Sequence, residues 1–300
     1  MSILRDNVNE GPKSLRKMIN SGYVVAPGVF NGVSALIAQR AGFRALYLSG
    51  SGIAGAMGLP DLSLTTLPEV AEEVRRITAV SKLPLIVDID TGFGEALNVA
   101  RAIKWIESAG AAAIHMEDQV LPKKCGQLAG KRIIKAEEMA RKIKMAVESR
   151  KDDNFLIIAR TDSRAIEGLD GAIRRGKLYM EAGADAIFPE ALESEAEFKE
   201  YAKKVNAPLL ANMTEFGKSP LLSAGELSKM GYKIIIFPLT GFRAAISTMD
   251  LVYNELNSSG TQRKVLPRLM TRKEFYGLIG YDDYGAEDEQ LSKYWDGKRK

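Results

Sequence analysis

Four stretches of the sequence share one pattern: RAGFRALYLSG (residues 40–50), SAGAAAIHMED (108–118), EAGADAIFPEA (181–191) and KMGYKIIIFPL (229–239). In each, a glycine follows a segment whose apolar residues have helical spacing, and a short, almost wholly apolar run comes next. Glycine tolerates the left-handed backbone that ends many helices. An apolar run of this length is typical of a parallel strand that is buried on both faces. The pattern therefore predicts a repeated turn from helix to buried strand, as in α/β folds.

Eight apolar runs of this kind predict eight strands, and an amphipathic segment after each one predicts a helix. The predicted strands are Tyr23–Pro27, Ala45–Leu48, Leu85–Asp90, Ala112–Glu117, Phe155–Thr161, Ala186–Pro189, Leu209–Met213 and Lys233–Pro238. The predicted helices are Gly32–Ala41, Leu67–Val80, Ala96–Ala109, Ala136–Ser149, Leu169–Ala182, Glu193–Val205, Ser223–Met230 and Gly241–Asn257. Eight such units are typical of a (β/α)₈ TIM-type barrel. A doubly wound open sheet is the alternative, but GVFNGVSA after the first strand lacks its GxGxxG signature.

The composition excludes several classes of protein. Hydrophobic residues make up 46% and charged residues 27% of the chain, as in globular domains, and its 1 cysteine excludes an intramolecular disulfide. The net charge of +4 is too small and dispersed to indicate nucleic acid binding. No signal-peptide pattern and no membrane-spanning apolar run is visible. We expect a cytoplasmic protein in which residues 1–300 form one barrel domain and residues 258–300 a helical C-terminal extension.

Carboxylates follow the predicted third and fourth strands, and active sites of barrels lie at such strand ends. Asp88 and Asp90 are two residues apart and can face the same side, where Glu117 can join them. Three carboxylates repel one another unless a cation or a proton relieves them. Oxygen ligands suit Mg²⁺. The alternative is that each carboxylate pairs with Arg160 or caps the next helix.

Three other features have both a structural and a functional interpretation. The glycine-rich turn that begins at Ser49 is either a flexible connection or a holder of carboxylate or phosphate groups. Cys125 is either a small buried residue or a reactive one, because the neighbouring lysines favour its thiolate. His115, which lies in phase with Glu117, is more typical of a hydrogen-bonded core residue than of a catalytic one.

Six motifs lie along the chain in order: VDIDTGFG (87–94), HMEDQV (115–120), KKCG (123–126), ARTD (159–162), FPEA (188–191) and NMTEFG (212–217). With YLSGSGIAGAMGLPDL (47–62) and TRKEFY (271–276), they resemble the isocitrate lyase/phosphoenolpyruvate mutase superfamily over nearly the whole chain. The resemblance implies a (β/α)₈ barrel that exchanges a helix between subunits of a homotetramer. It also implies cleavage of a carbon–carbon bond in a 2-hydroxy tricarboxylate with Mg²⁺, or alternatively Mn²⁺.

The resemblance further implies roles for individual residues. Cys125 and Arg160 match catalytic positions, Cys125 as the general acid, and Asp88, Asp90 and Glu117 match the metal site. The implied substrate-binding residues are Ser49, Gly50, Ser51, Asp61, Lys123, Gly126, Gln127, Arg160, Glu190, Asn212, Thr214, Arg243 and Arg272. Two positions depart from the family pattern, because Gln127 stands where a histidine is usual and Ser51 where a glycine is usual. A glutamine can form hydrogen bonds but cannot titrate.

Within the superfamily, the resemblance implies cleavage of 2-methylisocitrate to pyruvate and succinate as the expected activity. Isocitrate lyase, dimethylmalate-type lyase and oxaloacetate hydrolase activities are the alternatives. The methyl group that distinguishes 2-methylisocitrate from isocitrate changes pocket affinity by only about 1–3 kcal/mol. A non-catalytic barrel that serves as a binding protein is an alternative of a different class. The retained carboxylates, Cys125 and the arginines disfavour it.

Overall fold

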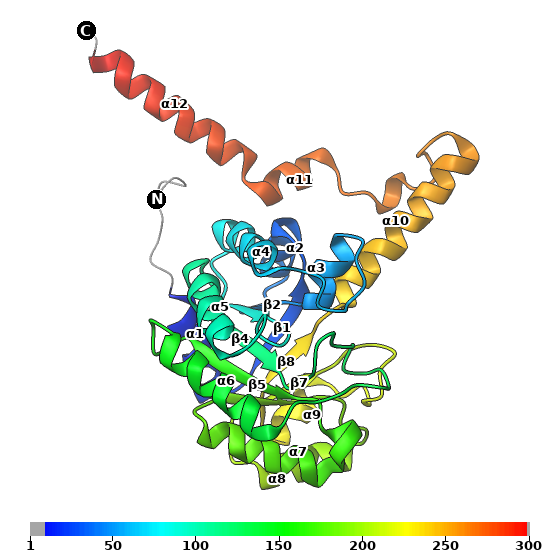
Figure 1. Ribbon diagram of the computed structural model, residues 1–300. Coiled ribbons are helices and arrows are strands. Elements are labelled where there is room, and N and C mark those ends of the chain that lie inside the picture. Colours follow the sequence, from blue (N-terminus) through cyan, green and yellow to red (C-terminus); the bar gives the residue numbers. More distant parts are fainter. Residues whose placement is uncertain (1–9, 299–300) are drawn as a thin grey trace. The chain divides into compact units, whose positions relative to one another are not determined.

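The computed structural model describes residues 10–298, which divide into two compact units, residues 10–243 and 244–298. The first unit is a closed barrel of eight parallel strands that follow one another in chain order, β1 to β8. Helices lie between successive strands along the chain and surround the barrel (Figure 1). The predicted (β/α)₈ fold is therefore confirmed.

The strands agree with the predicted ones to within a few residues. They are β1 Val24–Val29, β2 Leu46–Leu48, β3 Leu85–Asp88, β4 Ala113–Glu117, β5 Leu156–Thr161, β6 Ala186–Pro189, β7 Leu209–Asn212 and β8 Tyr232–Phe237. The helices of this unit are α1 Gly11–Ser21, α2 Gly32–Arg40, α3 Gly50–Ala56, α4 Leu67–Val80, α5 Ala96–Ser108, α6 Ala136–Ser149, α7 Arg164–Glu181, α8 Glu195–Lys204 and α9 Ala224–Lys229. Two of them, α1 and α3, were not predicted, and α7 begins earlier than expected, with a break at Gly168.

The predicted helix-to-strand turns are present at the four repeated stretches. Gly42, Gly110, Gly183 and Gly231 have φ values of 90°, 98°, 101° and 105°, and each follows the C-cap residue of its helix. Residues with a side chain rarely adopt this conformation, so glycine stops the helix at low cost. The chain then enters the next strand within a few residues.

Alternation along the strands separates an apolar interior layer from a polar layer above it. The apolar layer contains residues such as Ile86, Ile158 and Phe188, all fully buried. The residues two positions further on, Asp88, Arg160 and Glu190, face the same way at the C-terminal ends of their strands. The fold thus places charged side chains on a packed apolar floor, and that arrangement positions the site.

The described part of the second unit is helical. The boundary between the units falls within α10 (Thr240–Ser259), which is followed by the 3₁₀ turn Leu266–Arg268, α11 (Arg272–Ile279) and α12 (Tyr281–Lys298). The extension predicted to begin at residue 258 and the helix exchange between subunits stay predictions. None of the described helices has both the length and the apolar character needed to cross a membrane.

Candidate active site

A cavity of about 230 Å³ lies at the C-terminal ends of the strands, where the sequence predicted the site. Most of the predicted residues line it: Ser49, Ser51, Asp61, Asp88, Lys123, Cys125, Gly126, Gln127, Arg160, Glu190, Asn212, Thr214 and Arg243. Gly50, Asp90 and Glu117 do not line the cavity but contact residues that do. Arg272 belongs to α11 in the second unit, so its role stays a prediction.

The cavity also contains residues that were not predicted. They are Tyr47, Leu128, Glu215, Phe216, Gly217, Pro238 and Leu239. Tyr47 was identifiable, because it lies two residues before Ser49 and therefore faces the same side of the chain. The others come from loops after β4, β7 and β8, whose course does not follow from strand periodicity.

Asp88 ends β3 and is held by several donors. Its Oδ2 accepts hydrogen bonds from the Gly50 N–H at 3.1 Å and the Tyr47 hydroxyl at 3.4 Å, and its Oδ1 accepts one from the Asp90 N–H at 3.0 Å. Burial alone would raise the pKa of Asp88, but His115, Lys123 and neighbouring positive charge outweigh burial and lower it to about 2. Asp88 is therefore a carboxylate at neutral pH.

His115 is fully buried beneath Asp88, and its Nε2 lies 2.7 Å from the Tyr47 hydroxyl. Burial lowers the pKa of His115 to about 4, so the ring is neutral at neutral pH. The predicted role of a hydrogen-bonded core histidine is thereby confirmed. The positive charge that faces Asp88 at neutral pH consequently comes from Lys123 and Arg160.

Lys123 carries positive charge into the cavity from the loop after β4. Its Nζ lies 2.9 Å from Oδ1 of Asp90 and also donates to Asp61. Burial would lower the pKa of Lys123, but the surrounding carboxylates, Glu117 first among them, raise it well above its usual value. The pKa of Asp90 is raised by burial, against the effect of Lys123.

Arg160 faces three carboxylates at the centre of the site. Glu117 on β4 lies opposite Arg160 on β5 in the sheet, and Nη1 of Arg160 lies 3.0 Å from Oε2 of Glu117. Its Nε and Nη2 donate to Asp162 at 2.9 and 3.1 Å, and its Nη2 lies 3.8 Å from Glu190. Burial raises the pKa of Glu117 well above its usual value despite this arginine. The pairing of a strand-end carboxylate with Arg160, the alternative to a metal site in the sequence analysis, is therefore present for Glu117.

The predicted metal residues do not by themselves form a cage. Among residues 10–298, no group of three or more His, Cys, Asp or Glu side chains is arranged to hold a metal ion. The donor chemistry nevertheless fits Mg²⁺, which usually keeps several waters and binds one or two carboxylates. Glu117 Oε1 is buried and has no hydrogen-bond partner among the described residues, and Asp88 is ionised. Asp88, Asp90 and Glu117 thus offer oxygen ligands for a partly hydrated ion.

Cys125 is half-buried in the loop 119–135 and lines the cavity. Burial raises the pKa of its thiol, although the Gln127 N–H and Arg160 act in the opposite direction. The expectation that neighbouring lysines favour the thiolate was therefore wrong, because burial outweighs the nearby positive charge, and Lys123 pairs with Asp61 and Asp90. A thiol that keeps its proton is suited to act as an acid.

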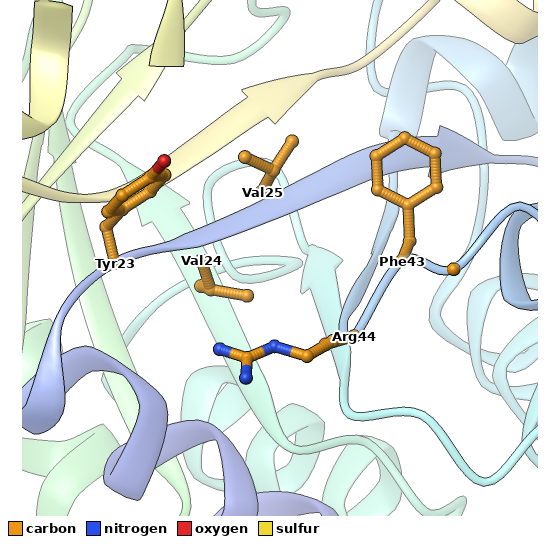
Figure 2. A pocket seen from close by; sticks show the side chains of 6 residues that line it. Tyr23, Val24, Val25, Phe43 and Arg44 are labelled. Carbon is orange, nitrogen blue, oxygen red and sulfur yellow. The ribbon is translucent and has the colours of Figure 1, made fainter. Parts of the chain in front are cut away.

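A second cavity, of about 390 Å³, lies near the beginning of β1 and contains none of the predicted site residues. It is lined by residues 23–25 and 42–44. Figure 2 shows that Tyr23 and Val25 lie on one side of the β1 ribbon and that Val24 and Arg44 lie on the other. These side chains do not converge on a common point, which disfavours this cavity as an active site.

Fold and site together define a (β/α)₈-barrel enzyme whose cavity is lined by many charged side chains and by the Cys125 thiol of the loop 119–135. Residues 15–257 match the phosphoenolpyruvate phosphomutase family, and the chain belongs to this family. It is 54% identical over 280 residues to the 2-methylisocitrate lyase of Aeropyrum pernix, covering 93% of this chain and 90% of the relative. The predicted superfamily is thereby confirmed.

Two solved structures extend the comparison. A 2,3-dimethylmalate lyase of the PEP mutase/isocitrate lyase superfamily superposes with a TM-score of 0.89 at 35% identity, covering 94% of this chain and 95% of that one. A phosphonopyruvate hydrolase in complex with oxalate and Mg²⁺ superposes with a TM-score of 0.84 at 31% identity, covering 95% and 98%. Both share the barrel fold described above.

Proposed function

We propose that this protein is a carbon–carbon lyase that cleaves 2-methylisocitrate to pyruvate and succinate with a bound Mg²⁺. The observation that carries the proposal is the 54% identity, over nearly the full chain, to a relative with this activity in its name. The 2,3-dimethylmalate lyase is only 35% identical to this chain, so it gives weaker support to the alternative activity, a dimethylmalate-type lyase.

The excess of carboxylates supports the metal part of the proposal. Carboxylates around the cavity outnumber cations: Asp61, Asp88, Asp90, Glu117, Asp162, Glu190 and Glu215 face Lys123, Lys131, Arg160 and Arg243. A divalent cation held by Asp88, Asp90 and Glu117 would relieve this repulsion. When bound, Mg²⁺ polarises the hydroxyl and carboxylate oxygens of a substrate. Mn²⁺ is the alternative ion, and the hydrolase complex with Mg²⁺ supports a metal at a related site.

The polar walls of the cavity support a tricarboxylate substrate. Arg160 and Arg243 supply positive charge, while Asn212 and Thr214 supply hydrogen-bonding groups at the end of β7. Ser49 and Ser51 line the wall at the end of β2. Groups that are already in place stabilise negative charge as it develops, without the reorganisation that water requires.

Cys125 supplies the proton in this proposal. The 2-hydroxyl of the substrate gives its proton to a carboxylate of the cavity, its oxygen becomes the carbonyl oxygen of pyruvate, and the carbon–carbon bond breaks with its electron pair left on the succinate fragment. The proton on Sγ of Cys125 then moves to that carbon, and the loop 119–135 excludes water from the cavity while this occurs. The raised pKa of the thiol keeps that proton in place until the carbanion forms.

The proposal includes a cytoplasmic homotetramer that exchanges a helix between subunits. The described residues of the second unit bury one large hydrophobic side chain, Val265, and expose many others, including Met249, Tyr253 and Phe275. Exposed apolar surface of this kind is typical of an interface. Light scattering is expected to give the mass of a tetramer, and a monomer would contradict this part.

The proposal is tested by measuring pyruvate release from 2-methylisocitrate. Enzyme stripped with EDTA should be inactive and should regain activity with Mg²⁺. Asp88→Asn should fail to regain it at the Mg²⁺ concentration that suffices for the wild type. Full activity of the stripped enzyme would refute the metal-dependent mechanism.

A further inference from the structure

Gln127 joins two loops at the edge of the cavity. Its side-chain Nε2 donates a hydrogen bond to Oε1 of Glu190, which directly follows β6. Its side-chain Oε1 accepts one from the backbone N–H of Lys218, in the segment after β7, at 2.8 Å. Both ends of the amide are therefore engaged by the protein itself.

Glu190 is a well-fixed partner for this contact. Its side chain is 1% exposed, and its Oε2 lies 3.2 Å from Nδ2 of Asn212 and 3.8 Å from Nη2 of Arg160. The bond from Gln127 thus ties the loop to a part of the barrel that does not move easily.

Two glycines allow the loops to approach this closely. A Cβ atom at Gly126 would lie 2.4 Å from Nη2 of Arg160 and 2.4 Å from Cγ of Glu190, so the loop backbone lies directly on these side chains. A Cβ atom at Gly217 would lie 2.7 Å from Oε1 of Gln127. The space around the Gln127 amide is therefore filled from both loops.

We propose that Gln127 is a positioning residue that fastens the loop 119–135 to Glu190 and to the segment after β7, and so holds the Cys125 thiol at the cavity. The inference rests on the proposed function for the role of that thiol. It also reassigns Gln127, which the family resemblance places among the substrate-binding residues. A ligand that used either end of the amide would have to break the contact between the loops.

The chain contains 1 cysteine, so labelling with iodoacetamide reports the position of Cys125 without any substrate. Gln127→Ala removes both hydrogen bonds, and Gln127→Glu keeps the size but places a carboxylate against Glu190. We expect Cys125 in each variant to be labelled about 10-fold faster than in the wild type. Loss of the hydrogen bonds should raise the ratio of detached to attached loop 119–135 by about this factor. Gly217→Ala, which displaces the amide of an unchanged Gln127, should change the rate in the same direction.

Arg132→Gln is the matched control, because Arg132 is exposed in the same loop, and it should label at the wild-type rate. If the thiol acts as proposed, the Gln127 variants should also lower kcat more than they raise KM. Unchanged labelling in both Gln127 variants and in Gly217→Ala would overturn the inference, whatever happens to turnover or melting temperature. Wild-type protein that fails to cleave 2-methylisocitrate would refute the proposed function and leave the labelling result interpretable.

Discussion

Replacing Arg160 with glutamine would leave several carboxylates in the barrel without their main cation. The guanidinium lies 3.0 Å from Glu117, 2.9 Å from Asp162 and 3.8 Å from Glu190. The side chain of Arg160 is 8% exposed, and the carboxylate side chains are 0–1% exposed. Water therefore cannot replace the lost charge.

Removing one partner of a buried ion pair costs about 3–5 kcal/mol. The three pairs belong to one network, so their costs do not add. Lys131 remains 3.0 Å from Asp162 and compensates part of the loss. We therefore expect the free energy of unfolding to fall by about 3 kcal/mol, at the lower end of that range. For a chain of this size this corresponds to a fall of about 6–12 °C in Tm.

The assay is urea unfolding followed by circular dichroism, together with thermal melting. Arg164→Gln is the matched control, because Arg164 also pairs with two carboxylates, Glu193 and Glu197, both at 2.6 Å, but its side chain is 20% exposed. Pairs near the surface contribute about 0–1 kcal/mol. If the free energy of unfolding fell by less than about 1 kcal/mol in both variants, burial would not determine the cost of removing the arginine, and the reasoning would be refuted.

Three further outcomes are expected. Cys125→Ser should lower kcat by about 10²–10⁴, the usual contribution of a general acid, while calorimetry shows substrate binding retained; unchanged turnover would exclude this role. Because burial raises the pKa of Cys125 above its ordinary value of 9.0, the acid keeps its proton at neutral pH, and the alkaline fall in kcat should begin above that value. This expectation would be contradicted if the alkaline fall in kcat began near pH 7 in the wild type and was absent in Cys125→Ser. Asp88→Asn should weaken Mg²⁺ binding in calorimetry, and unchanged affinity would move the metal site elsewhere.

Most of the barrel could be predicted because the strands are short apolar runs and four of the helix-to-strand turns carry a glycine, such as Gly110 before β4. The helix α3 had no such signal. It contains Gly50, Gly52 and Gly55, and each glycine lowers helix stability by about 1 kcal/mol relative to alanine. Burial of Ile53 and Ala54 outweighs this low propensity, and burial depends on the folded barrel.

The candidate site could be predicted in part. Strand periodicity placed Asp88, Glu117 and Arg160 at one end of the barrel, and the structure agrees. It could not predict the partner of Lys123, because that depends on the course of the loop 119–135. The lysine pairs with Asp61 and Asp90, while burial raises the pKa of the Cys125 thiol.

The central claim is that the cavity selects 2-methylisocitrate. The most direct test is proton NMR of the products formed from equal concentrations of 2-methylisocitrate and isocitrate with enzyme and Mg²⁺. We predict that pyruvate appears well ahead of glyoxylate. Glyoxylate ahead of pyruvate, or neither product, would contradict the proposed substrate.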